Sequence, residues 1–156
     1  MDQETEIIVA CDPGKGGGWA WQIPGFKLGV ESMPDTPHEL VRMLESIQAD
    51  GSVRVYLEEV GGYVGGAGNT GSSMFTFGRS FGETIGVCAA LGIPIELVRP
   101  QKWQKALGLG NSAGMTKAQW KRKLKERALQ LYPEAAVTLK VADAMLIFHA
   151  AAKGLI

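Results

Sequence analysis

Four acidic residues stand in contexts that suggest chemistry rather than simple solvation. Asp12 ends the β-favouring run "IIVACD", and Glu58 and Glu59 end a second such run, "VRVYLEE". Asp143 lies in the otherwise apolar stretch "VADAMLIF". A buried carboxylate is costly unless it is paired or bound to a cation, and oxygen ligands favour hard cations such as Mg²⁺ or Mn²⁺. Convergence of three of these acids would therefore predict a divalent metal site.

Each acid also has a simpler interpretation. Asp12 precedes Pro-Gly and is a good turn former. Asp143 is near enough to Val141 to cap its own helix. Because side chains alternate along a strand, Glu58 and Glu59 must face opposite sides of a sheet. Strand-ending Asp residues before glycines also occur in sugar kinases and actin-like ATPases, but those folds need two such halves, and "GKGGG" is not a Walker motif. We expect no nucleotide cofactor.

The order of the predicted elements indicates how these acids are positioned. Strands are predicted over residues 6–12, 17–23, 26–32, 53–59 and 93–98. Helices are predicted over 72–91, 100–107, 116–132 and 141–155, and one further helix begins at Thr36 and includes Ile47. A meander followed by alternating helices and strands favours a five-stranded mixed α/β sheet with helices on both faces. Right-handed crossovers place the fourth strand parallel to the first and beside it. Sites in such sheets form beyond the carboxyl ends of parallel strands, where Asp12 and the Glu pair lie.

Two predicted helices have clear starts. Thr36, Pro37 and Glu39 form a capping box with proline at the first helical position, and Thr116 and Gln119 form a second capping box. In the second of these helices we expect Trp120, Leu124, Ala128 and Leu131 to face inward. We expect Lys117, Lys121 and Lys125 to follow its outer side.

The helix predicted over 72–91 carries glycines four residues apart, at Gly78, Gly82 and Gly86. Glycine costs about 1 kcal/mol in a helix, so this stripe predicts a close approach by another backbone. The same helix carries more large apolar side chains than one sheet face readily buries: Met74, Phe75, Phe77 and Phe81. We therefore expect a C2 homodimer built chiefly on this helix. The preceding glycine-rich segment, 61–71, is predicted to be a loop.

Length and composition limit the class of protein. At 156 residues the chain is expected to form a single domain over 1–156. Its longest apolar stretch is too short for a membrane span, and the start "MDQETE" is not a signal peptide, so we expect a cytoplasmic protein with no membrane partner. Cys11 and Cys88 lie in apolar contexts and are expected to be small core residues rather than a disulfide.

Charge is unevenly distributed although the formal net charge is zero. Residues 99–127 contain nine Lys or Arg residues and one acid, Glu126, which gives a net charge of +8 in this segment and −8 in the remainder. Such a separation indicates a polyanionic partner on one side of the molecule. An ordinary solvated helix face is the alternative.

Several segments resemble the RuvC-type Holliday junction resolvases of the ribonuclease H-like superfamily, in particular their small phage and organellar members. The matching segments, which span nearly the whole chain, are "VACDPG", "VYLEEV", "SSMFTFGRSFGETIGVCAALGIPI", "VRPQKWQKALGL" and "ADAMLI". The resemblance implies a ribonuclease H-like sheet, a homodimer, a Mg²⁺ cofactor for which Mn²⁺ can substitute, and symmetric nicking of four-way DNA junctions with 5′-phosphate products.

The resemblance also assigns roles to residues. Asp12 takes the first-strand acid, Glu58 the second, because it lies two residues before Val60, and Asp143 the last-helix acid; these are the expected metal ligands. The family usually has a further ligand about one helical turn before the last acid, but Lys140 stands there in this chain. Lys140 is either a contact to the scissile phosphate or a surface lysine. This departure motivates an alternative function, a catalytically impaired protein that binds branched DNA.

DNA contacts are expected from the basic segment, the glycine loops and the central helix. Tyr63 is the residue expected to stack on an unpaired base at the branch point. The full set is Lys15, Tyr63, Arg79, Lys102, Lys117, Lys121 and Lys125.

Overall fold

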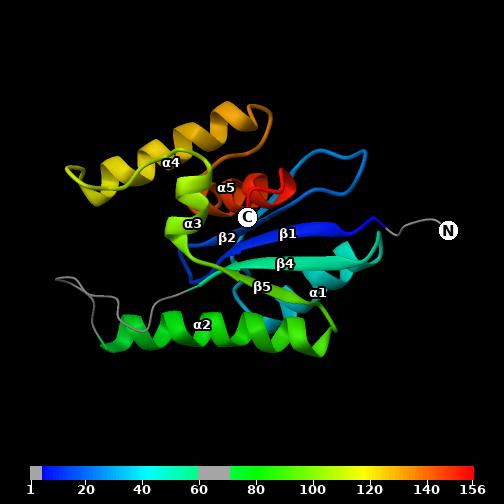
Figure 1. Cartoon of the computed structure of the whole chain (residues 1–156). Coiled ribbons are helices and arrows are strands. Elements are labelled where there is room, and N and C mark those ends of the chain that lie inside the picture. The colour runs from blue at the N-terminus through cyan, green and yellow to red at the C-terminus, as the bar shows by residue number, and fades with distance from the viewer. Residues whose placement is uncertain (1–4, 60–70) are drawn as a thin grey trace.

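The computed structural model describes residues 5–59 and 71–156 and contains a five-stranded mixed sheet (Figure 1). The strands are β1 (Ile7–Asp12), β2 (Gly18–Trp21), β3 (Gly29–Ser32), β4 (Val53–Glu58) and β5 (Ile95–Val98). The helices are α1 (Pro37–Gln48), α2 (Gly71–Ala90), α3 (Pro100–Ala106), α4 (Lys117–Leu131) and α5 (Ala142–Ala152). The strand order is β3-β2-β1-β4-β5, with β1 antiparallel to β2 and parallel to β4.

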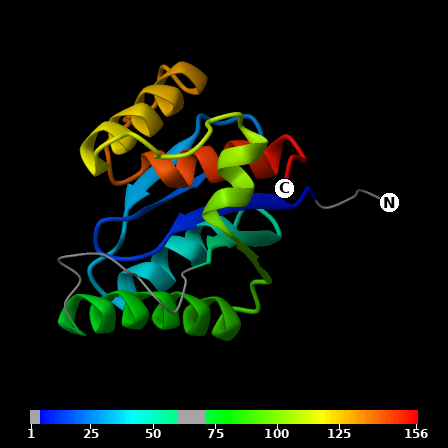
Figure 2. The same cartoon turned by 60° about the vertical axis from the view of Figure 1, so that its left-hand side comes forward.

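Helices cover both faces of the sheet, as Figures 1 and 2 show. On one face α1 and α2 bury a core around Leu44 and Cys88. On the other face α3, α4 and α5 bury a second core around Trp103 and Met145. α5 packs directly on β1 and β2 and is buried along nearly its whole length. Both cysteines are free and buried.

Strict alternation in β1 and β4 divides these strands between the two cores. Ile7, Val9 and Cys11 of β1 face the α1–α2 side. Ala10, and with it Asp12, faces the α5 side. In β4 the residues at 53, 55 and 57 likewise belong to the α1–α2 core, so Glu58 projects toward α5. The carboxylates at the two strand ends therefore lie on the same face.

The predicted fold class is confirmed, including the parallel placement of β4 beside β1 and both capping boxes. The segment at 100–107 forms the helix α3. Tyr63 and most of the segment 61–71 lie outside the described residues, but Gly71 begins α2. None of the helices in the described part of the chain is long and apolar enough to cross a bilayer.

One prediction about α4 is wrong. Lys121 does not lie on the outer side of the helix, because its ammonium contacts Asp143 of α5. Spacing explains this position: Lys121 lies three residues before Leu124 and seven before Ala128, both of which are buried against α5. Position along the helix, rather than residue type, decides which way the side chain points.

Candidate metal and nuclease site

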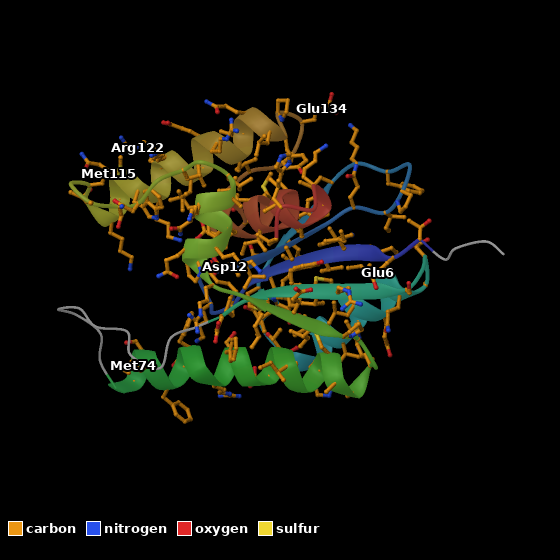
Figure 3. All side chains as sticks on the ribbon, viewed as in Figure 1. Glu6, Asp12, Met74, Met115, Arg122 and Glu134 are labelled. Atoms are coloured by element: carbon orange, nitrogen blue, oxygen red, sulfur yellow. The ribbon has the colours of Figure 1, made fainter. Side chains whose placement is uncertain are left out.

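Asp12 and Glu58 end adjacent parallel strands at one edge of the sheet. The register pairs Cys11 with Leu57, so Asp12 and Glu58 are the next residues along the two strands. In Figure 3, Asp12 lies at the end of β1 near the side where α2 begins, and Glu6 marks the opposite end. The side chain of Asp12 forms no hydrogen bond with any described residue, so a turn-forming role has no contact to support it. Glu59 points elsewhere and pairs with Arg99, at 3.2 Å between Oε2 and Nε.

Asp143 reaches the same place from the first turn of α5. Its side chain is 8% exposed, and its Oδ2 accepts a hydrogen bond from Lys121 Nζ at 2.7 Å. The other oxygen, Oδ1, is buried and finds no partner among residues 5–59 and 71–156. Among the described residues, the side chain of Asp143 bonds only to Lys121 and not to a backbone N–H at the start of α5, so helix capping does not account for Asp143.

The three acids affect one another electrostatically. Burial raises the pKa of Asp12 well above its ordinary value, and the charges of Glu58 and Asp143 raise it further. Burial, with the charge of Asp143, raises the pKa of Glu58 from 4.5 to about 7. These shifts mean that the cluster holds its negative charge at a free-energy cost that a bound cation would relieve.

Lys121 is a cation at this cluster. Burial favours a lower pKa for Lys121, but the charge of Asp143 and its hydrogen bond, together with Asp12 and Glu58, outweigh burial and raise the pKa. The ammonium therefore remains charged and opposes the upward pKa shifts of Asp12 and Glu58. One ammonium faces three carboxylates, so the cluster still has an excess of negative charge if all four groups are ionised.

Trp103 is a site residue to which the sequence assigns no role, although it lies in the segment "VRPQKWQKALGL" that resembles the resolvases. Its indole is fully buried, and Nε1 donates a hydrogen bond of 2.8 Å to Glu58 Oε2. This bond opposes the rise in the pKa of Glu58. It fixes one carboxylate oxygen and leaves the other available to a ligand.

The glycines after Asp12 let the chain fold tightly beside the carboxylate. Gly14 has φ +97°, and a Cβ there would lie 2.7 Å from the Phe77 ring of α2. A Cβ at Gly17 would collide with the Asp12 carbonyl oxygen. Gly14 N also donates to Ser80 Oγ at 3.2 Å, so the turn is attached to α2.

The chemical types of these ligands suit a divalent cation, but their positions do not form a complete metal-binding site. Three carboxylates lie within electrostatic reach of one another, one buried oxygen of Asp143 is unpaired, and burial disfavours the charged forms of Asp12 and Glu58. In the part of the chain that the structure describes, however, no group of three or more His, Cys, Asp or Glu side chains is close enough to hold a metal ion as placed. Oxygen ligands of this kind suit Mg²⁺ or Mn²⁺ once Lys121 and the carboxylates rearrange.

The described residues that were predicted to contact DNA, taken together with Lys140, fall into two groups. Lys15, Arg79 and Lys140 line one hollow of about 460 Å³ between the β1–β2 turn, α2 and the segment before α5. Arg79 also forms an ion pair with Glu83 at 2.7 Å. On the other side, Lys102 and Lys117 are exposed on α3 and α4, and Lys125 is half-buried. The structure brings the first three together but turns Lys121 inward.

The strand order and the helices on both faces form a five-stranded mixed α/β fold. Two solved structures show the same fold. One is Thermus thermophilus RuvC, with a TM-score of 0.57 and 18% identity over 96% of this chain and 97% of that chain. The other is T. thermophilus RuvC in complex with Holliday junction substrate, with a TM-score of 0.57 and 16% identity over 97% of this chain and 98% of that chain. The chain thus has a RuvC-like fold. No protein-family model and no curated protein matches the sequence.

Proposed function

We propose that the chain is a single-domain, structure-selective endodeoxyribonuclease that resolves four-way DNA junctions by paired nicks and depends on Mg²⁺, for which Mn²⁺ can substitute. The observation that carries the proposal is the meeting of Asp12, Glu58 and Asp143 on one sheet face within a RuvC-like fold. The neighbour that is bound to a Holliday junction supports branched DNA as the substrate class.

The residues of the site have different roles in metal binding and DNA binding. Asp12, Glu58 and Asp143 would hold the cation, and Trp103 holds Glu58 in one orientation through Nε1. The chemistry that divalent cations supply in phosphodiester hydrolysis is acidification of the attacking water and neutralisation of charge at the leaving 3′ oxygen. Lys15, Arg79 and Lys140, which line one hollow, would bind backbone phosphates.

The test is a cleavage assay on four DNA shapes. With Mg²⁺ we expect paired nicks with 5′-phosphate ends in a four-way junction, and much slower cleavage of duplex, flap and RNA–DNA hybrid. In Ca²⁺ we expect binding to the junction without cleavage. Binding without nicking in Mg²⁺ or Mn²⁺ would instead support a junction-binding protein, an alternative favoured by Lys140 and by the incomplete metal cage. No preference for the junction in either assay would contradict both functions.

The proposed enzyme needs two sites, and α2 offers a surface for a second copy. Phe75 is 72% exposed, Met74 and Ile85 are also exposed, and a Cβ added at Gly78, Gly82 or Gly86 would meet nothing within 4 Å. No other element in the described part of the chain therefore packs closely against the glycine stripe. An exposed apolar stripe with glycines suits a symmetric contact between two helices.

We expect light scattering to give about twice the 16.7 kDa chain mass. Phe75→Glu should shift the protein toward monomer and replace paired nicks by single ones, because it places charge on the most exposed apolar side chain of the stripe. Phe26→Glu is the matched control: Phe26 is 68% exposed but lies between β2 and β3, away from α2. A monomeric wild type that still nicks in opposed pairs would exclude this dimer.

A further inference from the structure

Lys121 reaches the acidic cluster from α4, on which the basic residues Lys117 and Arg122 are exposed. Leu124 and Ala128 attach α4 to α5, and Lys121 continues the same stripe one turn earlier. Its side chain is 36% exposed, and Lys117, one further turn back, is exposed. The packing of α4 against α5 thus fixes the direction of the Lys121 stem toward Asp143.

The contact satisfies only part of what Asp143 requires. Lys121 Nζ lies 2.7 Å from Oδ2, while Oδ1 is buried and unpaired with any described residue. An ammonium is a compact point charge on a flexible four-carbon stem, so it can leave without disturbing the helix that carries it. A divalent cation would bring twice the charge and would accept several oxygen ligands at once.

We propose that Lys121 is a built-in counter-ion that neutralises part of the acidic site in the metal-free protein and must be displaced from Asp143 when a divalent cation binds. The inference rests on the proposed function for the identity of that cation. It makes Lys121 a positioning residue that sets cation affinity: the energy of its ion pair with Asp143 is subtracted from the affinity of the site. It also explains why the acids are neighbours without forming a finished metal cage.

The test is titration of the full chain with Mn²⁺ in the absence of DNA, in which isothermal calorimetry measures the binding affinity. Thermal melting is measured separately in EDTA and in Mn²⁺. Lys121→Met keeps the length and apolar contacts of the stem but removes the charge. Because removing the ammonium leaves the buried carboxylate of Asp143 uncompensated, we expect this variant to bind Mn²⁺ about tenfold more tightly or better. In EDTA it should melt below the wild type, and saturating Mn²⁺ should largely remove that difference.

Two further variants make the result interpretable. Lys117→Met removes a charge from the exposed surface of the same helix and should change neither measurement appreciably. Lys121→Gln, which can still hydrogen-bond to Asp143, is used if the Met variant does not fold, and should also bind Mn²⁺ more tightly. Mn²⁺ binding that is equal or weaker in the Lys121 variants would overturn this inference while leaving the proposed function standing. No Mn²⁺ binding by any variant or the wild type would overturn both.

Discussion

Asp143→Asn is expected to abolish nicking of four-way junctions while junction binding in Ca²⁺ is retained, and Asp12→Asn and Glu58→Gln should do the same. The amide keeps the shape of the side chain but removes the negative charge that would hold the cation. Loss of a residue that merely supports a metal ligand costs about 10–100-fold. Loss of a ligand itself should therefore reduce the cleavage rate by at least about 100-fold. The measurement is single-turnover cleavage, with binding followed separately.

Glu59→Gln is the matched control for this prediction. Glu59 is adjacent to Glu58 but pairs with Arg99 instead of facing α5, so its neutralisation should leave the cleavage rate within a few-fold of wild type. Comparable activity in Asp12→Asn, Glu58→Gln or Asp143→Asn would remove that residue from the site. Loss of activity in Glu59→Gln with normal Glu58→Gln would show that the other face of β4 is the functional one.

Neutralising Glu58 is expected to stabilise the metal-free protein at neutral and higher pH. Because the pKa of Glu58 is about 7 in the folded state against 4.5 ordinarily, the folded state binds more protons between these values. Stability must then fall as the pH rises through this window, and the raised pKa of Asp12 acts in the same direction. The full difference in the pKa of Glu58 corresponds to at most about 3–4 kcal/mol, since one pKa unit is about 1.4 kcal/mol.

Thermal melting in EDTA at pH 5 and pH 8 tests this prediction. Glu58→Gln still accepts the Trp103 hydrogen bond, so its melting temperature should match the wild type near pH 5 and exceed it by roughly 5–10 °C at pH 8. Glu59→Gln should show no such growing difference, because its side chain is outside the cluster. If the melting temperature of Glu58→Gln gains nothing relative to wild type between pH 5 and pH 8, the folded state does not disfavour the ionised form of Glu58.

Much of the fold followed from local signals in the sequence. Alternation in "VRVYLEE" predicted both β4 and the separation of Glu58 from Glu59, and the capping boxes at Thr36 and Thr116 fixed the starts of α1 and α4. The handedness of crossovers then placed Asp12 beside Glu58. These features depend on neighbours in the chain or on a general rule of chain topology.

The contacts to the acids were harder to predict because they join distant elements. Trp103 meets Glu58 across 45 positions, and neither residue alone indicates the other. Lys121 was within reach of sequence reasoning, since its spacing to Leu124 and Ala128 is helical, but its residue type led to a surface assignment. Whether Lys15, Arg79 and Lys140 touch DNA stays a prediction, although they share one hollow.

The alternation in β1 and β4 has a consequence for how such a chain can vary. Each acid is one residue beyond a core residue, Cys11 before Asp12 and Leu57 before Glu58, and the two neighbours point to opposite faces of the sheet. Deletion or insertion of one residue within either strand would exchange the faces, bury the carboxylate against α1 and α2, and expel an apolar side chain toward α5. Substitutions that keep the alternation of β1 and β4 thus preserve this site even between distant relatives. Insertions and deletions preserve it only in the connections outside these two strands.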